Sequence, residues 1–278
     1  MSEYYRFKLG AFSCVALSDG YHDYEPDSFF AGVPPQEVES ELIRVGANTT
    51  LIRTPYTFLL VDTGRHRVLV DLGAGTIFPT TGKLVSSLNA SGYGVEDIDA
   101  VTITHAHPDH VGGALDKDGR LIFPQAHYYI HKSEWDFWFS EDARQIAPEH
   151  FVEIARKQMQ PMAQIRTLVG SDREVLPGVS MIYAPGHTPG HCVILFESDG
   201  EKLIYAADTV IYPLHLEHPD WLPVFDLSPS DAENSKRTIY DLAAAENIMV
   251  LAQHFPPFPS TGTIKKTETG WRFSPEKF

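Results

Sequence analysis

Three histidines and one aspartate lie within six positions of this chain, directly after a stretch that predicts a buried strand. Residues 105–110 read HAHPDH, and residues 97–104 before them carry the apolar side chains of the strand. His105 and His107, two positions apart on extended backbone, are expected to point the same way, while Asp109 and His110 come where a helix is predicted to begin near residue 111. Imidazole and carboxylate are the usual ligands of zinc. Because four ligands from one short loop can hardly all reach one tetrahedral ion, the segment predicts two metal ions.

Three further side chains of metal-ligand type follow, each beyond a predicted strand. His187 lies in the turn-rich segment 184–191, which reads APGHTPGH. Asp208 follows a strand at 203–207, and His254 follows a strand at 248–252. Each would be weak evidence alone. Together with the HAHPDH loop, they place ligand types at the carboxyl ends of four successive strands, where one shared site can form.

Charge and composition exclude several classes of protein. The chain has 37 acidic and 22 basic residues, a formal charge of -15, which is the wrong sign for attracting nucleic acid. No apolar stretch approaches the roughly 18 residues of a membrane span, and the first residues lack the apolar run of a secretory signal. We therefore expect a cytoplasmic protein with no membrane partner. The two cysteines, Cys14 and Cys192, are expected to be buried thiols.

The order of predicted elements indicates an α/β fold with two sheets between helices. No repeat, long linker or change of composition marks a boundary, so residues 1–278 are expected to form a single domain. Residues 62–64 are expected to form a hairpin turn, and the tail from 256 to be loop plus one strand. Predicted strands cover 4–17, 49–53, 57–61, 67–71, 97–104, 180–183, 192–197, 203–207, 248–252 and 270–273; predicted helices cover 132–139, 148–166 and 230–245.

The two histidine motifs, the later aspartate and the final histidine resemble those of the metallo-β-lactamase superfamily, in the same order and over nearly the whole chain. The resemblance implies a four-layer αβ/βα sandwich with a dinuclear metal site at the edge of the two sheets. It implies two Zn²⁺, with Mn, Fe or Co as alternatives. By motif position, the first metal would be bound by His105, His107 and His187, the second by Asp109, His110 and His254, and both by a bridging Asp208.

Differences between this chain and other branches of the superfamily narrow the function that the resemblance implies. Main dinuclear β-lactamases have arginine where His110 stands and cysteine where Asp208 stands, which disfavours antibiotic hydrolysis. Glyoxalase II relatives carry a helical domain in place of the short tail 256–278, and flavodiiron enzymes have glutamate where His107 stands. The segments SDG at 18–20, HPDW at 218–221 and HFP at 254–256 are similar to the group of methyl parathion hydrolase and quorum-quenching lactonases.

The resemblance therefore implies a metal-dependent hydrolase of the lactonase or esterase type. A metal-bridging hydroxide would open lactones or cleave related esters, and Asp109 would return the proton to the leaving alkoxide. A phosphotriesterase or arylesterase on the same site is the first alternative, and a mononuclear iron sulfur-dioxygenase is the second, although His110 and His254 complete a second metal set. A nuclease is disfavoured by the charge, and a metal-free binding protein by the intact ligand set. The expected partners are a small-molecule substrate and, as an open alternative, a second copy in a homodimer.

Two side chains are expected to support the ligands without binding metal. Asp71 ends the predicted strand 67–71 and matches the aspartate that follows this strand in the family. Asp199-Gly200 predicts a two-residue hairpin turn, which pairs position 191 with position 208, so His191 should face Asp208. For the substrate pocket, aromatic residues are the candidates, each with the alternative of a core position. They are Phe29, Phe30, Trp135, Trp138 and Tyr212, the last displaced by one position from the tyrosine of the acyl-homoserine lactonases.

Overall fold

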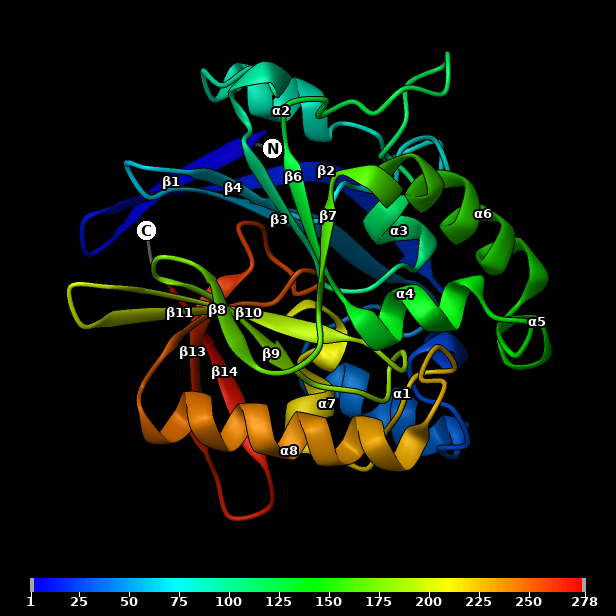
Figure 1. The fold of residues 1–278 in the computed structure, drawn as a ribbon. Coiled ribbons are helices and arrows are strands. Elements are labelled where there is room, and N and C mark those ends of the chain that lie inside the picture. Colours follow the sequence, from blue (N-terminus) through cyan, green and yellow to red (C-terminus); the bar gives the residue numbers. More distant parts are fainter. Residues whose placement is uncertain (1–2, 277–278) are drawn as a thin grey trace.

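The computed structural model describes residues 3–276, which form two seven-stranded sheets packed face to face (Figure 1). In both sheets, strands that follow one another in the chain lie side by side. The first sheet contains β1 (Tyr4–Leu9), β2 (Phe12–Tyr24), β3 (Ile52–Asp62), β4 (Arg67–Val70), β5 (Ala100–Ile103), β6 (His127–His131) and β7 (Arg166–Val169). The second contains β8 (Arg173–Leu176), β9 (Val179–Tyr183), β10 (Cys192–Ser198), β11 (Glu201–Tyr205), β12 (Met249–Leu251), β13 (Thr261–Lys266) and β14 (Trp271–Pro275).

Helices cover the outer faces of both sheets, which gives the predicted four layers (Figure 1). The first sheet carries α2 (Leu84–Ala90), α3 (Pro108–Val111), α4 (Lys132–Phe139), α5 (Ala143–Ile146) and α6 (Glu149–Met159). On the side of the second sheet lie α1 (Pro35–Arg44), α7 (Leu214–Glu217) and α8 (Pro229–Ala245). Short 3₁₀ turns occur at Pro26–Ser28, Val95–Asp97, Gln160–Gln164 and Ala207–Thr209.

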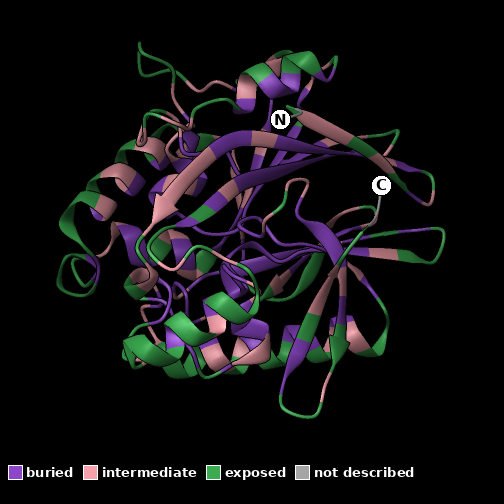
Figure 2. Cartoon of the chain, turned by 180° about the vertical axis from the view of Figure 1, so that it is seen from behind, coloured by how far each residue is buried: buried purple, intermediate pink, exposed green. Residues whose placement is uncertain are grey.

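Separate apolar clusters bind these layers together, and Figure 2 shows the buried residues concentrated between them. The central cluster joins Leu59 and Val61 of the first sheet to Ile194 and Phe196 of the second. Burying apolar surface is the main stabilising contribution of such a core. The two sheets are thereby fixed relative to each other, and so are the loops at their common edge.

Parallel pairing places those loops at one edge. Strands β4, β5, β6 and β7 run parallel, as do β11 and β12. The carboxyl ends of parallel strands lie on the same side of a sheet, so the loops after β5, β11 and β12 gather there. Among residues 3–276, no helix is long and apolar enough to cross a membrane.

Several predicted boundaries were wrong. The separate strands expected at 49–53 and 57–61 are one strand, β3. The single strand expected over residues 4–17 is two antiparallel strands, β1 and β2, and β2 continues to Tyr24 with an irregularity between Ser18 and Gly20. Asp19 is buried there, and its carboxylate accepts hydrogen bonds from the Ala74 and Leu84 backbone N–H groups, so the SDG segment anchors a neighbouring loop.

The other differences concern helix bounds and the tail. The helix expected over 148–166 is α6, which ends at Met159 and is followed by a 3₁₀ turn. The helix expected from residue 111 is α3, which begins at Pro108 and ends at Val111, so Asp109 and His110 lie within it. Helix α8 begins at Pro229 and not at 230, because proline is well suited to the first helical position. The tail forms two strands, β13 and β14, which extend the second sheet.

Candidate metal centre

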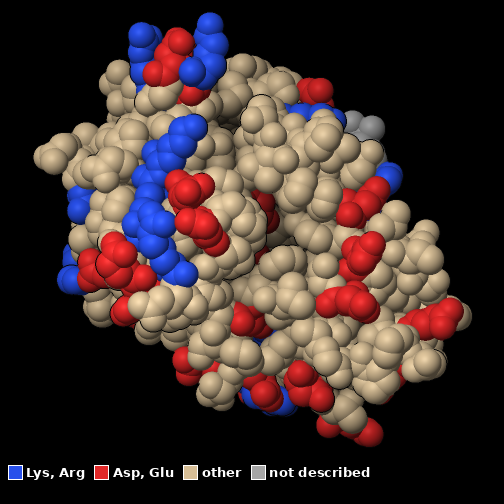
Figure 3. Space-filling model, turned by 90° about the vertical axis from the view of Figure 1, so that its right-hand side faces the viewer, with Lys and Arg blue, Asp and Glu red and all other residues tan. Residues whose placement is uncertain are grey.

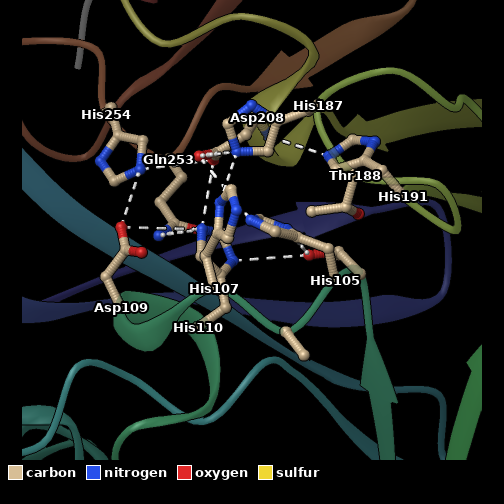
Figure 4. Close-up of polar contacts among 12 residues, drawn as sticks. His105, His107, Asp109, His110, His187, Thr188, His191, Asp208, Gln253 and His254 are labelled. Carbon is tan, nitrogen blue, oxygen red and sulfur yellow. Dashed lines mark hydrogen bonds and ion pairs between the residues drawn. The ribbon is translucent and has the colours of Figure 1, made fainter. Parts of the chain in front are cut away.

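All seven predicted ligand side chains meet at the common edge of the two sheets (Figure 4). The loop after β5 and helix α3 carry the HAHPDH residues, and the loop between β9 and β10 carries His187. Asp208 follows β11, where Ala207 has a φ of 44° in the left-handed region, and His254 follows β12. Within the described residues the side chains form two groups, in each of which the ligand atoms lie within 4.8 Å of one another. One group is His105, His107 and His187, and the other is Asp109, His110, Asp208 and His254.

The Asp208 carboxylate lies between the two groups and turns one oxygen toward each. Its Oδ2 is 3.2 Å from His187 Nε2 and 3.9 Å from His105 Nε2. Its Oδ1 is 3.2 Å from His110 Nε2 and 3.3 Å from His254 Nε2. A single carboxylate thus faces both groups, as a bridging ligand requires.

Several polar atoms at this centre are buried and have no hydrogen-bond partner among the residues that the structure describes. They include Nε2 of His105, Nε2 of His107 and Oδ1 of Asp208. Buried polar atoms in folded proteins are nearly always paired, so such a cluster calls for a partner of another kind. Burial and the neighbouring imidazoles hold the pKa of His105 and of His107 well below the usual value, so both rings are neutral and keep a lone pair for a cation. The nitrogen and oxygen donors fit two zinc ions.

Asp71 supports this centre from behind, as expected from its position. It is fully buried and has a φ of 60°, a strained conformation for a residue other than glycine. Its Oδ2 is 2.9 Å from His110 Nδ1 and accepts from the Thr104 hydroxyl, while Oδ1 accepts from the Thr104 backbone N–H. Holding Nδ1 in this way leaves His110 Nε2 turned toward Asp208.

His191 lies beside Asp208, in the register that the hairpin predicts. The ladder between β10 and β11 pairs Ile194 with Tyr205, which is the predicted register. Burial lowers the pKa of His191 to about 3, so the ring is neutral. Its Nδ1 donates to the Ala184 carbonyl, and its Nε2 accepts from the Asp208 backbone N–H at 3.2 Å. His191 therefore faces Asp208, as the hairpin register predicts, and it holds the Asp208 backbone.

Glu134 on α4 is a supporting residue that the sequence did not reveal. Its side chain is fully buried and accepts four hydrogen bonds. Oε1 accepts from the Ala106 N–H at 2.8 Å and from Trp138 Nε1 at 2.6 Å; Oε2 accepts from the Thr188 hydroxyl at 2.6 Å and from the Gly190 N–H at 2.9 Å. Ala106 separates two ligands, and Thr188 follows a third. One carboxylate therefore ties together the two loops that supply the first ligand group.

Asp226 and Lys236 form a second support that the sequence did not reveal. Asp226 Oδ1 lies 2.8 Å from His187 Nδ1, and Asp226 Oδ2 lies 3.2 Å from the ammonium of Lys236, which is buried. Lys236 falls on the face of α8 that also buries Ala232, Ile239 and Tyr240. A lysine on the apolar face of a helix was thus the sequence feature that could have revealed Lys236. Asp226 lies in a loop, and no sequence feature pointed to it.

An apolar cavity opens over the metal ligands, with a volume of about 180 Å³. The face shown in Figure 3 is hollowed near its centre, with a band of basic side chains on the left and further basic side chains at the top and edges. Besides the ligands His107, Asp109, His187, Asp208 and His254, the lining consists of Tyr24, Phe29, Thr54, Ile77, Phe78, Pro108, His150, Phe151, Ile154, Ile211 and Phe225.

Of the five predicted pocket residues, only Phe29 lines this cavity. Phe30 is buried against His215 and Trp221, and Tyr212 faces a separate hollow beside Arg53. Trp135 stacks on Phe139 and lies under Arg166. Trp138 is fully buried, and its indole N–H is used by Glu134. The aromatic run of α4 is core because that helix packs on the first sheet, and the cavity walls come instead from loops, from α6 and from β2 and β3.

We expect Glu134→Gln to weaken metal binding about 10- to 100-fold, the usual loss when a residue that supports the ligands is changed. The new amide NH₂ would face two donors where the carboxylate oxygen accepted two hydrogen bonds, so one ligand loop would lose its tie. A titration of the metal-free protein with zinc against a competing chelator measures the affinity. Glu153→Gln, at an exposed position of α6, is the matched control and should bind as the wild type does. Equal affinity in both variants would show that the loops hold their positions without Glu134.

Comparison with known proteins agrees with this geometry. The metallo-beta-lactamase superfamily matches residues 43–254. An N-acyl homoserine lactonase of Bacillus cereus is 28% identical over 165 residues, which cover 55% of this chain and 59% of that protein. One from Bacillus thuringiensis is 23% identical over 224 residues, which cover 73% of this chain and 82% of that protein. The match thus spans only about three fifths of the first relative.

Two solved structures are similar over the whole chain. AidC, a dizinc quorum-quenching lactonase in complex with a product, is 29% identical, with a TM-score of 0.94 over 100% of this chain and 98% of that one. The hydrolase AbOPH of the beta lactamase superfamily is 27% identical, with a TM-score of 0.92 over 100% and 99% of the two chains.

Proposed function

Because this chain belongs to the metallo-beta-lactamase superfamily, we propose that it is a dinuclear zinc hydrolase that opens lactones and cleaves related esters. The observation that carries the proposal is the Asp208 carboxylate, which turns one oxygen toward each ligand group at the floor of an apolar cavity. The similarity to N-acyl homoserine lactonases and to AidC supports a lactone as the substrate.

The residues of the chain have distinct parts in this reaction. Zinc ions held by the two groups would supply a Lewis acid for the carbonyl oxygen and a water of lowered pKa. The apolar walls bind the hydrocarbon part of the substrate and keep bulk water away from the reacting carbonyl. Asp109 lines the cavity, with Oδ2 3.4 Å from His254 Nε2, and is the carboxylate that we propose moves a proton to the leaving oxygen.

A phosphotriester or aryl ester is the second candidate substrate. Five aromatic side chains line the cavity, and they suit a flat leaving group as well as an acyl chain. They are Tyr24, Phe29, Phe78, Phe151 and Phe225.

The proposal is tested by comparing kcat/KM of the zinc-loaded enzyme on four substrate types. These are an N-acyl homoserine lactone, a γ-lactone, p-nitrophenyl acetate and a diethyl aryl phosphate. We expect the highest value for one of the two lactones. A higher value for the phosphate would favour the second candidate, and no hydrolysis of either lactone would contradict the proposed function.

A further inference from the structure

Beyond the metal ligands, the cavity offers few polar groups to a substrate. Three other polar side chains line it, those of Tyr24, Thr54 and His150. The Thr54 hydroxyl donates to the Ile52 carbonyl of its own strand at 3.4 Å, and His150 is exposed. Tyr24 is therefore the polar side chain best placed to act within the cavity.

The hydroxyl of Tyr24 is held by a second tyrosine. The two hydroxyl oxygens of Tyr24 and Tyr56 are 2.5 Å apart, so one of them donates to the other. Tyr56 is fully buried, and within residues 3–276 its hydroxyl has no other hydrogen-bond partner. Buried hydroxyl groups nearly always donate their proton to an acceptor, and the Tyr24 oxygen is the acceptor within reach of Tyr56. Tyr56 therefore donates to Tyr24, and the proton of Tyr24 is left without an acceptor.

The surroundings of Tyr24 are apolar on the cavity side. Its ring centre lies 5.1 Å from that of Phe29, 6.0 Å from that of Phe225 and 6.5 Å from that of Phe78, all of which line the cavity. Tyr56 lies toward the metal ligands, since its ring centre is 4.9 Å from that of His254. The pair thus connects the ligand end of the cavity to its aromatic walls. Burial raises the pKa of the Tyr24 hydroxyl above its usual value near 10, so the group is protonated at neutral pH and is available as a donor.

We propose that Tyr24 donates a hydrogen bond to a second acceptor oxygen of the substrate, apart from the carbonyl that is attacked. The inference rests on the proposed function, because the attacked carbonyl lies at the metal ligands while Tyr24 lies among the aromatic walls. It defines the substrate class as a lactone or ester that carries an acceptor, such as an amide carbonyl, between the reacting group and an apolar tail. Tyr56 is a positioning residue that fixes the direction of the Tyr24 hydroxyl.

Two lactones separate this role from a structural one. N-hexanoyl homoserine lactone carries an amide carbonyl between ring and tail, whereas γ-nonalactone carries only the tail. We expect Tyr24→Phe to raise KM for N-hexanoyl homoserine lactone about 3- to 10-fold, because the substrate loses one neutral hydrogen bond. The kcat for this lactone should stay within about 2-fold of the wild-type value. For γ-nonalactone, KM should stay within about 2-fold. Tyr56→Phe should raise KM in the same substrate-selective way by about 2- to 5-fold, because the Tyr24 hydroxyl loses its orientation.

Tyr21→Phe, on the same strand but outside the cavity lining, is the matched control and should leave both KM values unchanged. Equal KM changes for the two lactones in Tyr24→Phe, or no change for either, would overturn the proposal while leaving lactone hydrolysis intact. If the wild type hydrolyses neither lactone, the proposed function fails, and the role of Tyr24 fails with it.

Discussion

Replacing Asp208 with alanine is expected to reduce kcat/KM by at least about 10³-fold, more than replacing any single histidine ligand. The reason is geometric, because Asp208 is the one ligand that turns an oxygen toward both groups. A histidine variant damages one group, whereas Asp208→Ala removes a ligand from both and takes away the negative charge that offsets two cations. Losses of this size are typical when a central electrostatic group is removed from a site.

Steady-state kinetics and metal analysis should be carried out on the same preparations of Asp208→Ala, His187→Ala and His254→Ala. Asp118→Ala, at an exposed loop position, is the matched control and should keep full activity. If Asp208→Ala kept most of its kcat with two metals bound, Asp208 would not be the bridge.

The second large effect is that of metal removal. We expect the fully loaded protein to contain two zinc ions per chain, because seven ligand side chains are more than one zinc can use. Chelation should abolish activity and lower the Tm, since ions that bind only the folded state stabilise it. Elemental analysis during reloading, together with calorimetry, measures both effects.

A histidine variant outside the candidate ligands tests whether the two ions are bound by the two ligand groups. His127, whose Nε2 is 2.8 Å from the Thr167 hydroxyl, lies outside both groups, so His127→Ala should still bind two ions. Saturation of the wild type at one ion per chain would contradict the dinuclear centre and favour a mononuclear iron enzyme.

The metal affinity should also depend on pH. Burial opposes the charged form of His187 and of His254, but the nearby carboxylates of Asp208 and its neighbours outweigh burial and raise the pKa of each ring to about 9. A protonated imidazole cannot bind a metal, so a proton must leave each ring first. Affinity should therefore fall as the pH is lowered from about 9, which zinc titrations at several pH values will measure.

The sequence revealed the candidate metal ligands because their chemistry is local. The HAHPDH segment carries four candidate ligand side chains within six positions, so a site of this kind leaves a short, dense pattern in the sequence. The alternation of strands and helices likewise predicted two sheets between helices. The Asp199-Gly200 turn predicted the register of β10 and β11, since a two-residue hairpin leaves no freedom in pairing.

The sequence did not reveal the supports and the cavity because their contacts are distant along the chain. Glu134 bonds to Gly190, 56 positions away, and Tyr24 bonds to Tyr56, 32 positions away. Nothing near a lone glutamate or tyrosine indicates such a partner, and aromatic residues look alike whether they fill a core or line a cavity. Trp138 proved to be core and Phe225 a cavity wall because the packing of helices and loops on the sheets decided which ring faces outward. The sequence thus determined the candidate metal ligands and the layers, while the tertiary structure decided how those side chains are held and which surfaces line the cavity.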